Sequence, residues 1–405
     1  MADIVFAFDA AIDRPIAIPE AAPAAVANAL SAAPLDALRA AAAAAQEAHA
    51  KALVLFGRVL DPHRASPAQA AALRGIITAL AADGCHTVWL TDDATAGNDI
   101  ARILGDPRGL CVGTPLAPVR LDIRGLPVEI VCGRGDVAAT DIHPAVHAPA
   151  HRRVIVGWDT AHWSMERWDE AGATSPQAFP AWQQPGCHAV WGSRRVRPLP
   201  PDVQPVAALQ PRSAHDTAGS CTLLSLLDFG AGDAFAAGEG RGQWRTLPTQ
   251  RAVWRTLTVA SASGGDEELA TAIWSALESL PRDPAAPLEI VRCSVECGTS
   301  VARRVRVAEI AAETLARVRE LLDQRATRAW CHELCAHPGE SLAPLGHARS
   351  GGRPGSTTSF SSALADIVLD VEHAPLSTAL PPGLAMPADM AREAGWLALE
   401  LIESA

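Results

Sequence analysis

The chain of 405 residues has no tyrosine and a single lysine, Lys51, whereas it has 31 prolines and 30 glycines. This usage is typical of a GC-rich genome and carries little functional weight. Hydrophobic residues make up 49% of the chain and charged residues 20%, which are ordinary fractions for a globular protein and exclude global disorder. A chain of this length can bury a substantial core. The length predicts two domains with an appendage.

The sequence lacks an excess of positive charge. Its 34 lysines and arginines are outnumbered by 45 acidic residues, for a formal net charge of -11. This balance argues against a whole surface that holds DNA by electrostatic attraction. A local basic patch stays open at Arg194, Arg195 and Arg197.

The sequence also lacks a basic leader followed by an apolar core, and it has no apolar run long enough to span a bilayer. The alanine-rich segment 37–50 is interrupted by Gln46, Glu47 and His49, which predicts a helix and not a membrane span. The nine cysteines are scattered, and their odd number indicates reduced thiols. We therefore expect a cytoplasmic protein without a membrane partner.

Short apolar runs alternate with helical segments in residues 1–228, which is the pattern of strands layered between helices. Ser66 followed by Pro67 predicts the start of one helix. The expected helices are 22–50, 67–83 and 97–104. The expected strands are 3–8, 52–56, 87–91, 127–132, 153–158, 188–191 and 221–227.

A second unit is expected at residues 243–338, after a glycine-rich loop. The pattern of this unit predicts a β-α-β-α-β order, with strands at 255–260, 288–297 and 328–334 and helices at 266–280 and 307–323. By composition, residues 339–358 form a linker, and residues 359–405 form a tail with two short amphipathic stretches.

Five segments in the first part of the chain resemble the motifs of a nuclease family in order and spacing. They are IVFAFDAAID at 4–13, ALVLFGRVLD at 52–61, DGCHTVWLTDDATA at 83–96, VIVGWDT at 154–160 and CHAVWGSRR at 187–195. The similarity continues through QPRSAHDTAGSCTLLSL at 210–226 and VWRTLTVASASGGDEELATAIWSAL at 253–277. The family is that of the SbcD and YhaO-like DNA repair exonucleases, within the calcineurin-like metallophosphoesterase superfamily.

The resemblance implies an α/β fold with a metallophosphoesterase-like layered β-sandwich flanked by helices. It also implies a small α+β capping domain and a C-terminal helical tail. In such a fold the five segments converge on one cleft. The residues of this chain that would line a degenerate cleft are Asp9, Asp13, Arg58, Asp61, Asp92, Asp93, Trp158, Gly192 and Arg195.

The chain departs from the family at most of the metal-binding positions. The histidine of the first motif is Ala11, and the bridging aspartate of the second is Arg58. The third motif reads Asp92-Asp93-Ala94-Thr95 where the family has Gly-Asn-His-Asp, Trp158 stands at a ligand histidine, and Ser193 and Arg195 replace two more histidines around Gly192. Asp9 is the only clearly retained ligand position.

Family members use two Mn- or Mg-like ions, which need several carboxylate and imidazole ligands. One aspartate cannot hold two such ions, and a guanidinium at the bridging position repels them. At a distance of about 4 Å and an effective dielectric constant of about 20, each unit-charge repulsion is about 4 kcal/mol. We therefore expect no metal cofactor.

Several of these residues also have plainer interpretations. Asp9 could cap a helix, and Arg58 could be an exposed loop cation or an ion-pair partner of Asp9 in place of the metal. Trp158 could pack in the core. Asp92 and Asp93 could be turn residues, or could rebuild a cation site with Asp9.

Three functions follow from these alternatives. The first is a catalytically degenerate homologue of the SbcD/YhaO-like nucleases that acts as a structural or regulatory subunit. The second is an active metal-dependent DNA exonuclease or phosphoesterase with a rebuilt site. The third is a phosphate or nucleotide sensor in which Arg58, Arg194 and Arg195 bind an anion without hydrolysing it.

The resemblance also implies a partner. In the family, helices after the capping domain bind the coiled-coil base of an SMC-like ATPase of the SbcC or YhaN type. Residues 359–405 could dock on such a partner or fold back on the chain. DNA and a second copy of the chain stay open as further partners.

Overall fold

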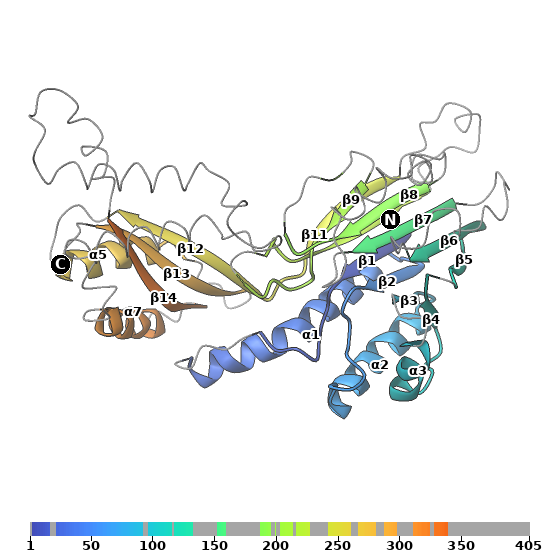
Figure 1. The fold of residues 1–405 in the computed structure, drawn as a ribbon, viewed down its shortest axis with the longest axis horizontal. Helices are drawn as coiled ribbons and strands as arrows, with labels where there is room; N and C mark the ends of the chain where they lie inside the picture. Colours follow the sequence, from blue (N-terminus) through green and yellow to red (C-terminus); the bar gives the residue numbers. More distant parts are fainter. Residues whose placement is uncertain are drawn as a thin grey trace, which may run out of the picture. The chain divides into compact units, whose positions relative to one another are not determined.

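The computed structural model describes residues 2–16, 22–91, 96–115, 117–132, 152–158, 187–195, 199, 203–213, 216–226, 242–260, 266–280, 287–297, 311–324 and 328–338. Within these residues the protein is an α/β protein with three β-sheets and five helices (Figure 1). The predicted linker 339–358 and tail 359–405 lie outside the described residues.

The chain divides into two compact units. The first comprises Met1–Leu257, Leu277–Arg292 and Leu315–Glu333, and the second comprises Thr258–Ala276, Cys293–Thr314 and Leu334–Ala405. The candidate site and its supporting sheets belong to the first unit. The domain boundaries that the sequence suggested stay predictions.

A six-stranded sheet in the order β11-β10-β1-β2-β3-β4 lies at the centre of the first unit. Its parallel part is β1 (Ile4–Phe8), β2 (Ala52–Phe56), β3 (His86–Leu90) and β4 (Leu110–Gly113). β10 (Ser220–Ser225) pairs antiparallel with β1, and β11 (Gln243–Pro248) pairs antiparallel with β10. The chain therefore returns after more than 200 residues to lie beside its own first strand.

Three helices cover one face of this sheet: α1 (Ala24–Glu47), α2 (Pro67–Ala82) and α3 (Ala96–Leu104) (Figure 1). The covered face carries Val5 and Ala7 of β1, which pack with Leu38 of α1 and Leu73 of α2. Alternate residues of a strand point to opposite faces, so the neighbouring β1 residues must pack on the other side.

A second, five-stranded sheet lies on that other side, in the order β5-β6-β7-β8-β9. It consists of β5 (Val119–Ile123), β6 (Leu126–Cys132), β7 (Arg152–Trp158), β8 (Cys187–Gly192) and β9 (Val203–Val206). β5 runs antiparallel to β6, and the other four strands are parallel.

The two sheets share a buried apolar layer. Ile4, Phe6 and Phe8 of β1 pack there with residues of the second sheet such as Val154 and Val190. These three β1 residues are at most 2% exposed. The described part of the first unit thus has a helix layer, a sheet and a second sheet, whereas the sequence predicted strands layered between helices.

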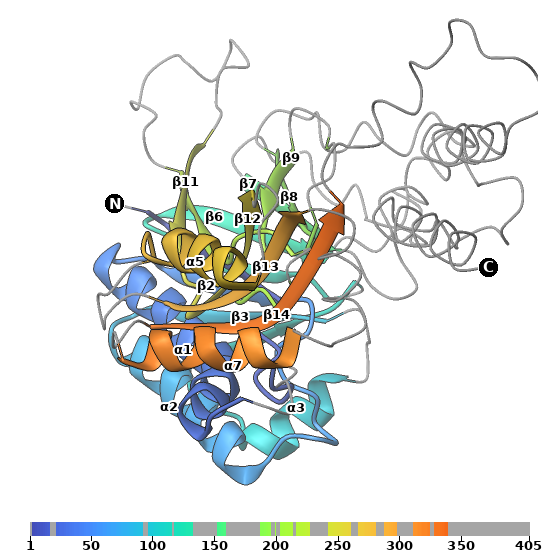
Figure 2. The ribbon, with the colours of Figure 1, turned by 90° about the vertical axis from the view of Figure 1, so that its left-hand side faces the viewer.

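The third sheet has the order β12-β13-β14. Its strands are β12 (Ala252–Ala260), β13 (Leu288–Cys297) and β14 (Ala329–Pro338), and the intervening helices are α5 (Asp266–Leu277) and α7 (Ala311–Gln324) (Figure 2). Within the first unit, Ala252, Ile290 and Trp330 pack with Ile16 and Leu30 of the N-terminal region.

Most predicted elements are confirmed to within a few residues, and α2 begins with the predicted capping pair. The Ser66 side chain accepts from Gln69 N at 3.2 Å, and the Gln69 side chain accepts from Ser66 N at 2.8 Å. The first helix was predicted to reach residue 50, but it ends at Glu47 because His49 adopts a positive φ of 53°.

Four short strands, β4, β5, β9 and β11, were not predicted. β4, β5 and β9 have only four or five residues, and the residues of β11 are exposed or half-buried. Segments this short give a weak signal even where apolar and polar residues alternate, as they do in VRLDI of β5. No helix among the described residues is both long and apolar enough to cross a membrane.

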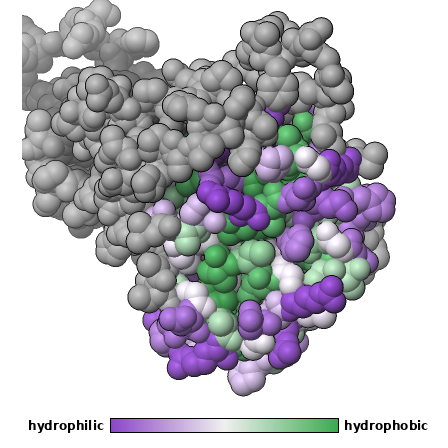
Figure 3. Space-filling model, turned by 90° about the vertical axis from the view of Figure 1, so that its right-hand side faces the viewer, coloured by the Kyte–Doolittle hydropathy of each residue, from purple (hydrophilic) through white to green (hydrophobic). Residues whose placement is uncertain are grey.

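On the face drawn in Figure 3, apolar side chains gather in the middle and hydrophilic ones border them.

Candidate functional site

The candidate site begins in the loops that follow β1 and β2. Phe8 lies opposite Phe56 in the parallel register, so both strands end at the same edge of the sheet. The loops continue side by side, because Asp9 N donates to Phe56 O at 2.9 Å and Ala11 N donates to Arg58 O at 2.7 Å. This pairing brings Asp9 next to Arg58.

The backbone of these loops is strained. Asp9 and Ala11 have positive φ angles of 53° and 40°, in a backbone region that residues other than glycine rarely adopt. Gly57 also has a positive φ, of 71°, and a Cβ on it would lie 2.6 Å from the ring of Phe8. Outliers of this kind cluster at functional sites, where the surrounding structure holds them in place.

Asp9 is buried, with 2% of its side chain exposed, and it is paired with two arginines. Arg58 donates from Nε to Oδ1 at 3.1 Å and from Nη2 to Oδ2 at 3.3 Å. Arg194 donates from Nε to Oδ2. Both carboxylate oxygens are therefore engaged by guanidinium groups, and the ion pair of Asp9 with Arg58 is present as one of the predicted alternatives.

Gly192 makes the approach of Arg194 possible. It is the last residue of β8, and a Cβ there would lie 2.5 Å from Cδ2 of Phe8 and 2.7 Å from Cε2 of Phe56. The absence of a side chain lets the end of β8 lie directly on these two rings. Two residues later, Arg194 reaches the carboxylate that follows Phe8.

A third arginine, Arg212, binds backbone carbonyl oxygens of the loop after β1. Its Nη2 donates to Ala11 O at 2.7 Å, and its Nη1 donates to Arg14 O. Burial, followed by the positive charges of Arg194 and Arg58, lowers the pKa of Arg212 from 12.5 to about 10, although the negative charges of Asp9 and Asp13 offset part of the effect. Arg212 thus shares the electrostatic environment of the other two arginines.

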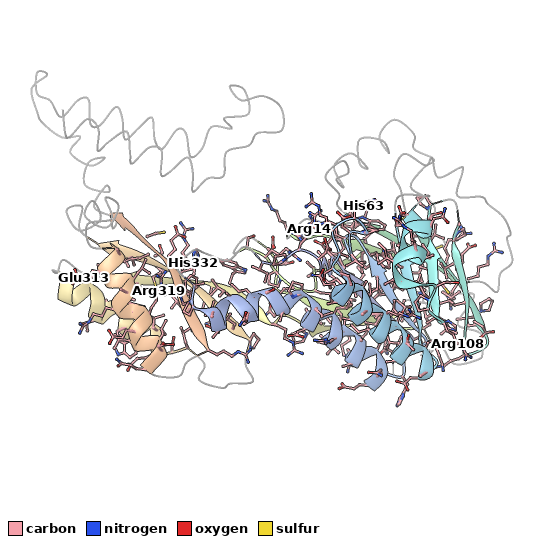
Figure 4. The ribbon with its side chains drawn as sticks, turned by 90° about the horizontal axis from the view of Figure 1, so that it is seen from below. Arg14, His63, Arg108, Glu313, Arg319 and His332 are labelled. Atoms are coloured by element: carbon pink, nitrogen blue, oxygen red, sulfur yellow. The ribbon has the colours of Figure 1, made fainter. Side chains whose placement is uncertain are left out.

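The remaining acidic residues near these loops have local partners. The Oδ2 of Asp13 lies 3.8 Å from Nε of Arg14. Asp61 accepts from His63 N at 3.0 Å and pairs with Arg64 at 3.6 Å. In Figure 4, Arg14 and His63 lie on the upper side of the view, whereas Arg108 lies at the lower right.

Other predicted cleft residues do not join the cluster. Trp158 is 7% exposed and packs 5.9 Å from the ring of Phe56, so its interpretation as a core residue is confirmed. Arg195 is exposed, and among the described contacts Arg194, not Arg195, meets Asp9. Asp92 and Asp93 lie outside the described residues.

The described residues do not fit two metal ions. No group of three or more His, Cys, Asp or Glu side chains among them is placed to hold a cation. Asp9, the one ligand position that the sequence retained, already accepts from Arg58 and Arg194. A dication would have to displace two guanidiniums and would then face their charge.

Sequence reasoning missed Arg212 and did not include Arg194 among the cleft residues. Arg194 was named in a basic run and in the anion-sensor alternative, but its neighbour Arg195 was placed in the cleft instead. Arg212 had one signal, since it lies in the segment 210–226 that carries the family resemblance. Its role depends on a contact with a loop 201 residues earlier in the chain.

Comparison with known proteins adds no assignment: the sequence matches no family model and no curated protein.

Proposed function

We propose that the chain is a catalytically degenerate relative of the SbcD/YhaO-like nucleases that acts as a structural or regulatory subunit. The observation that carries this proposal is the pairing of Asp9 with Arg58 and Arg194. Two-metal phosphodiester hydrolysis needs carboxylates that are free to coordinate. Here the single retained carboxylate is neutralised by arginine.

The layered fold gives further support. Two stacked sheets carry helices on the outer face of one of them, and β1, β2 and β8 bring Asp9, Arg58 and Arg194 together at their ends. A metallophosphoesterase-like sandwich with its cleft at strand ends is the finer fold that we propose. In this proposal the chain keeps the fold of the nucleases and has lost their metal-dependent hydrolysis together with the metal ligands.

The test is metal content and Mn-dependent nuclease activity of the purified full-length chain. We expect no stoichiometric transition metal and no cleavage of single- or double-stranded DNA. The matched variant is Asp9→Ala. Robust cleavage by the wild-type chain that Asp9→Ala abolishes would overturn the proposal in favour of an active nuclease.

We also propose an SMC-like ATPase as the partner of this subunit, bound through the capping region and residues 359–405. The resemblance is the basis of this proposal. The test is co-purification of the chain with an ATPase that combines a phosphate-binding loop with long heptad repeats. A chain without residues 359–405 should keep a folded α/β domain by circular dichroism and lose the partner, and retained binding or collapse of the main domain would count against the docking role.

A further inference from the structure

The arginine cluster of Arg58, Arg194 and Arg212 carries more charge than its carboxylate can balance. Arg58 and Arg194 pair with Asp9, and Arg212 binds the same loop through Ala11 O, where the charges of Arg194, Asp9 and Arg58 affect its pKa. Asp13 adds a negative charge to the same surroundings, but Arg14 accompanies it at 3.8 Å. The cluster is therefore left with about two uncompensated positive charges.

The hydrogen-bonding capacity of the cluster is also unfilled. Arg194 Nη2 and Arg212 Nε are buried and have no hydrogen-bond partner among the described residues. A guanidinium has five N–H donors, and a buried donor without an acceptor destabilises the folded protein. An acceptor of negative charge would satisfy both the donors and the charge.

The guanidiniums of Arg58 and Arg194 also keep nitrogens that Asp9 does not use. Arg58 uses Nε and Nη2 on Asp9, which leaves Nη1, and Arg194 uses Nε, which leaves both terminal nitrogens. The side chains of Arg58 and Arg194 are 49% and 27% exposed, although Nη2 of Arg194 is itself buried. Planar guanidiniums bind the oxygens of phosphate groups through paired N–H donors.

We propose that Arg58 and Arg194, backed by Arg212, bind one phosphate-type dianion on the side of the cluster that faces away from Asp9. A terminal phosphate carries the two negative charges that the cluster lacks. Inorganic phosphate and the phosphate of a nucleoside monophosphate share this chemistry. The inference deepens the proposed function and rests on it, because the anion binds where a catalytic relative would hold metal ions.

The test is isothermal titration calorimetry of the full-length chain with inorganic phosphate, adenosine 5′-monophosphate and sulfate, at low ionic strength. We expect one phosphate site, binding of sulfate at the same site because guanidiniums donate to both oxyanions, and binding of phosphate about tenfold weaker in Arg58→Gln and in Arg194→Gln. If the chain binds the nucleotide more tightly than inorganic phosphate, the ligand is a nucleotide. If the two affinities are equal, the ligand is free phosphate. The matched control is Arg108→Gln, which changes an exposed arginine and should bind as the wild type does.

A second variant keeps the test independent of folding defects. Asp9→Asn removes the negative charge that competes with the ligand, so it should bind phosphate several-fold more tightly, whereas a damaged fold would bind less. Absence of phosphate binding in the wild type, or equal loss in Arg108→Gln, would overturn the inference. Either result leaves the proposed function standing, because that proposal is decided by metal content and nuclease activity.

Discussion

Arg58 contacts Asp9 through two nitrogens, Nε at 3.1 Å from Oδ1 and Nη2 at 3.3 Å from Oδ2, although 49 residues separate them in the chain. The pair follows from the parallel register of β1 and β2, which ends both strands at one edge. Because Asp9 is buried and Arg58 half exposed, the arginine brings its charge to a carboxylate that water cannot reach. The consequences can be measured as stability and as metal binding.

Removal of either arginine should destabilise the fold, because it leaves the buried Asp9 with one partner. Arg58→Gln and Arg194→Gln should each lower the free energy of unfolding by about 1–2 kcal/mol, and the double variant by about 3–5 kcal/mol. Urea denaturation measures these values. The matched substitution Arg195→Gln, at the exposed neighbour, should change stability by less than about 0.5 kcal/mol. Equal effects at positions 194 and 195 would contradict the pairing.

Substitution of Arg58 by aspartate, the residue type at the corresponding position of the family that the chain resembles, should not create a metal site. Arg58→Asp should raise the affinity for Mn only modestly, because Ala11, Trp158, Ser193 and Arg195 still supply no ligand. Equilibrium dialysis with Mn and elemental analysis measure the affinity and the stoichiometry. Two tightly bound ions in this variant would show that ligands exist elsewhere in the chain.

Gly192→Ala should destabilise the protein by about 1–3 kcal/mol, since the new Cβ would overlap the rings of Phe8 and Phe56. Displacement of β8 should also loosen the contact between Arg194 and Asp9. The control is Gly75→Ala in α2, where a Cβ meets nothing within 4 Å. There the gain in helix propensity should stabilise the protein by about 0.5–1 kcal/mol, so the two substitutions have opposite signs in thermal denaturation.

His188 should make stability depend on pH. Burial lowers its pKa from 6.5 to about 4, and the charge of Arg152 adds to the effect. The unfolded chain therefore binds a proton on His188 that the folded chain does not, and stability should fall as the pH drops from 6.5 to about 4, by about 3 kcal/mol in total. Above pH 6.5 this contribution is constant.

Urea denaturation at several pH values measures that dependence, and His188→Gln should flatten it. The control is His86→Gln, at an exposed position of β3, which should leave the slope unchanged. An unchanged slope in His188→Gln would assign the pH dependence to other groups.

Gln210→Leu should cost about 2–4 kcal/mol, because it removes four hydrogen bonds inside the protein. Gln210 Nε2 donates to Pro211 O at 2.9 Å and Ala252 O at 2.7 Å, and its Oε1 accepts from Arg251 N at 2.7 Å and Ala252 N at 3.2 Å. Chemical denaturation measures the loss. Gln204→Leu, on a half-buried residue with one weak bond of 3.3 Å, should cost far less.

The sequence by itself determined the local elements and one contact of the site. The uninterrupted apolar runs IVFAF and ALVLF predict β1 and β2, and the pair Ser66 and Pro67 predicts the start of α2. Adjacent parallel strands end together, so Asp9 and Arg58 could be expected to meet once both strands were predicted. These features depend on residues that are close in the chain or on strands that follow one another.

Only the tertiary structure decided the rest. Arg194 reaches Asp9 across 185 residues, because the second sheet stacks on the first and Gly192 lets β8 approach the rings of Phe8 and Phe56. Arg212 reaches Ala11 because the chain returns beside β1 as β10. No local pattern encodes such contacts, since they arise from the packing of whole sheets, and that packing converts the retained aspartate into the centre of an arginine cluster.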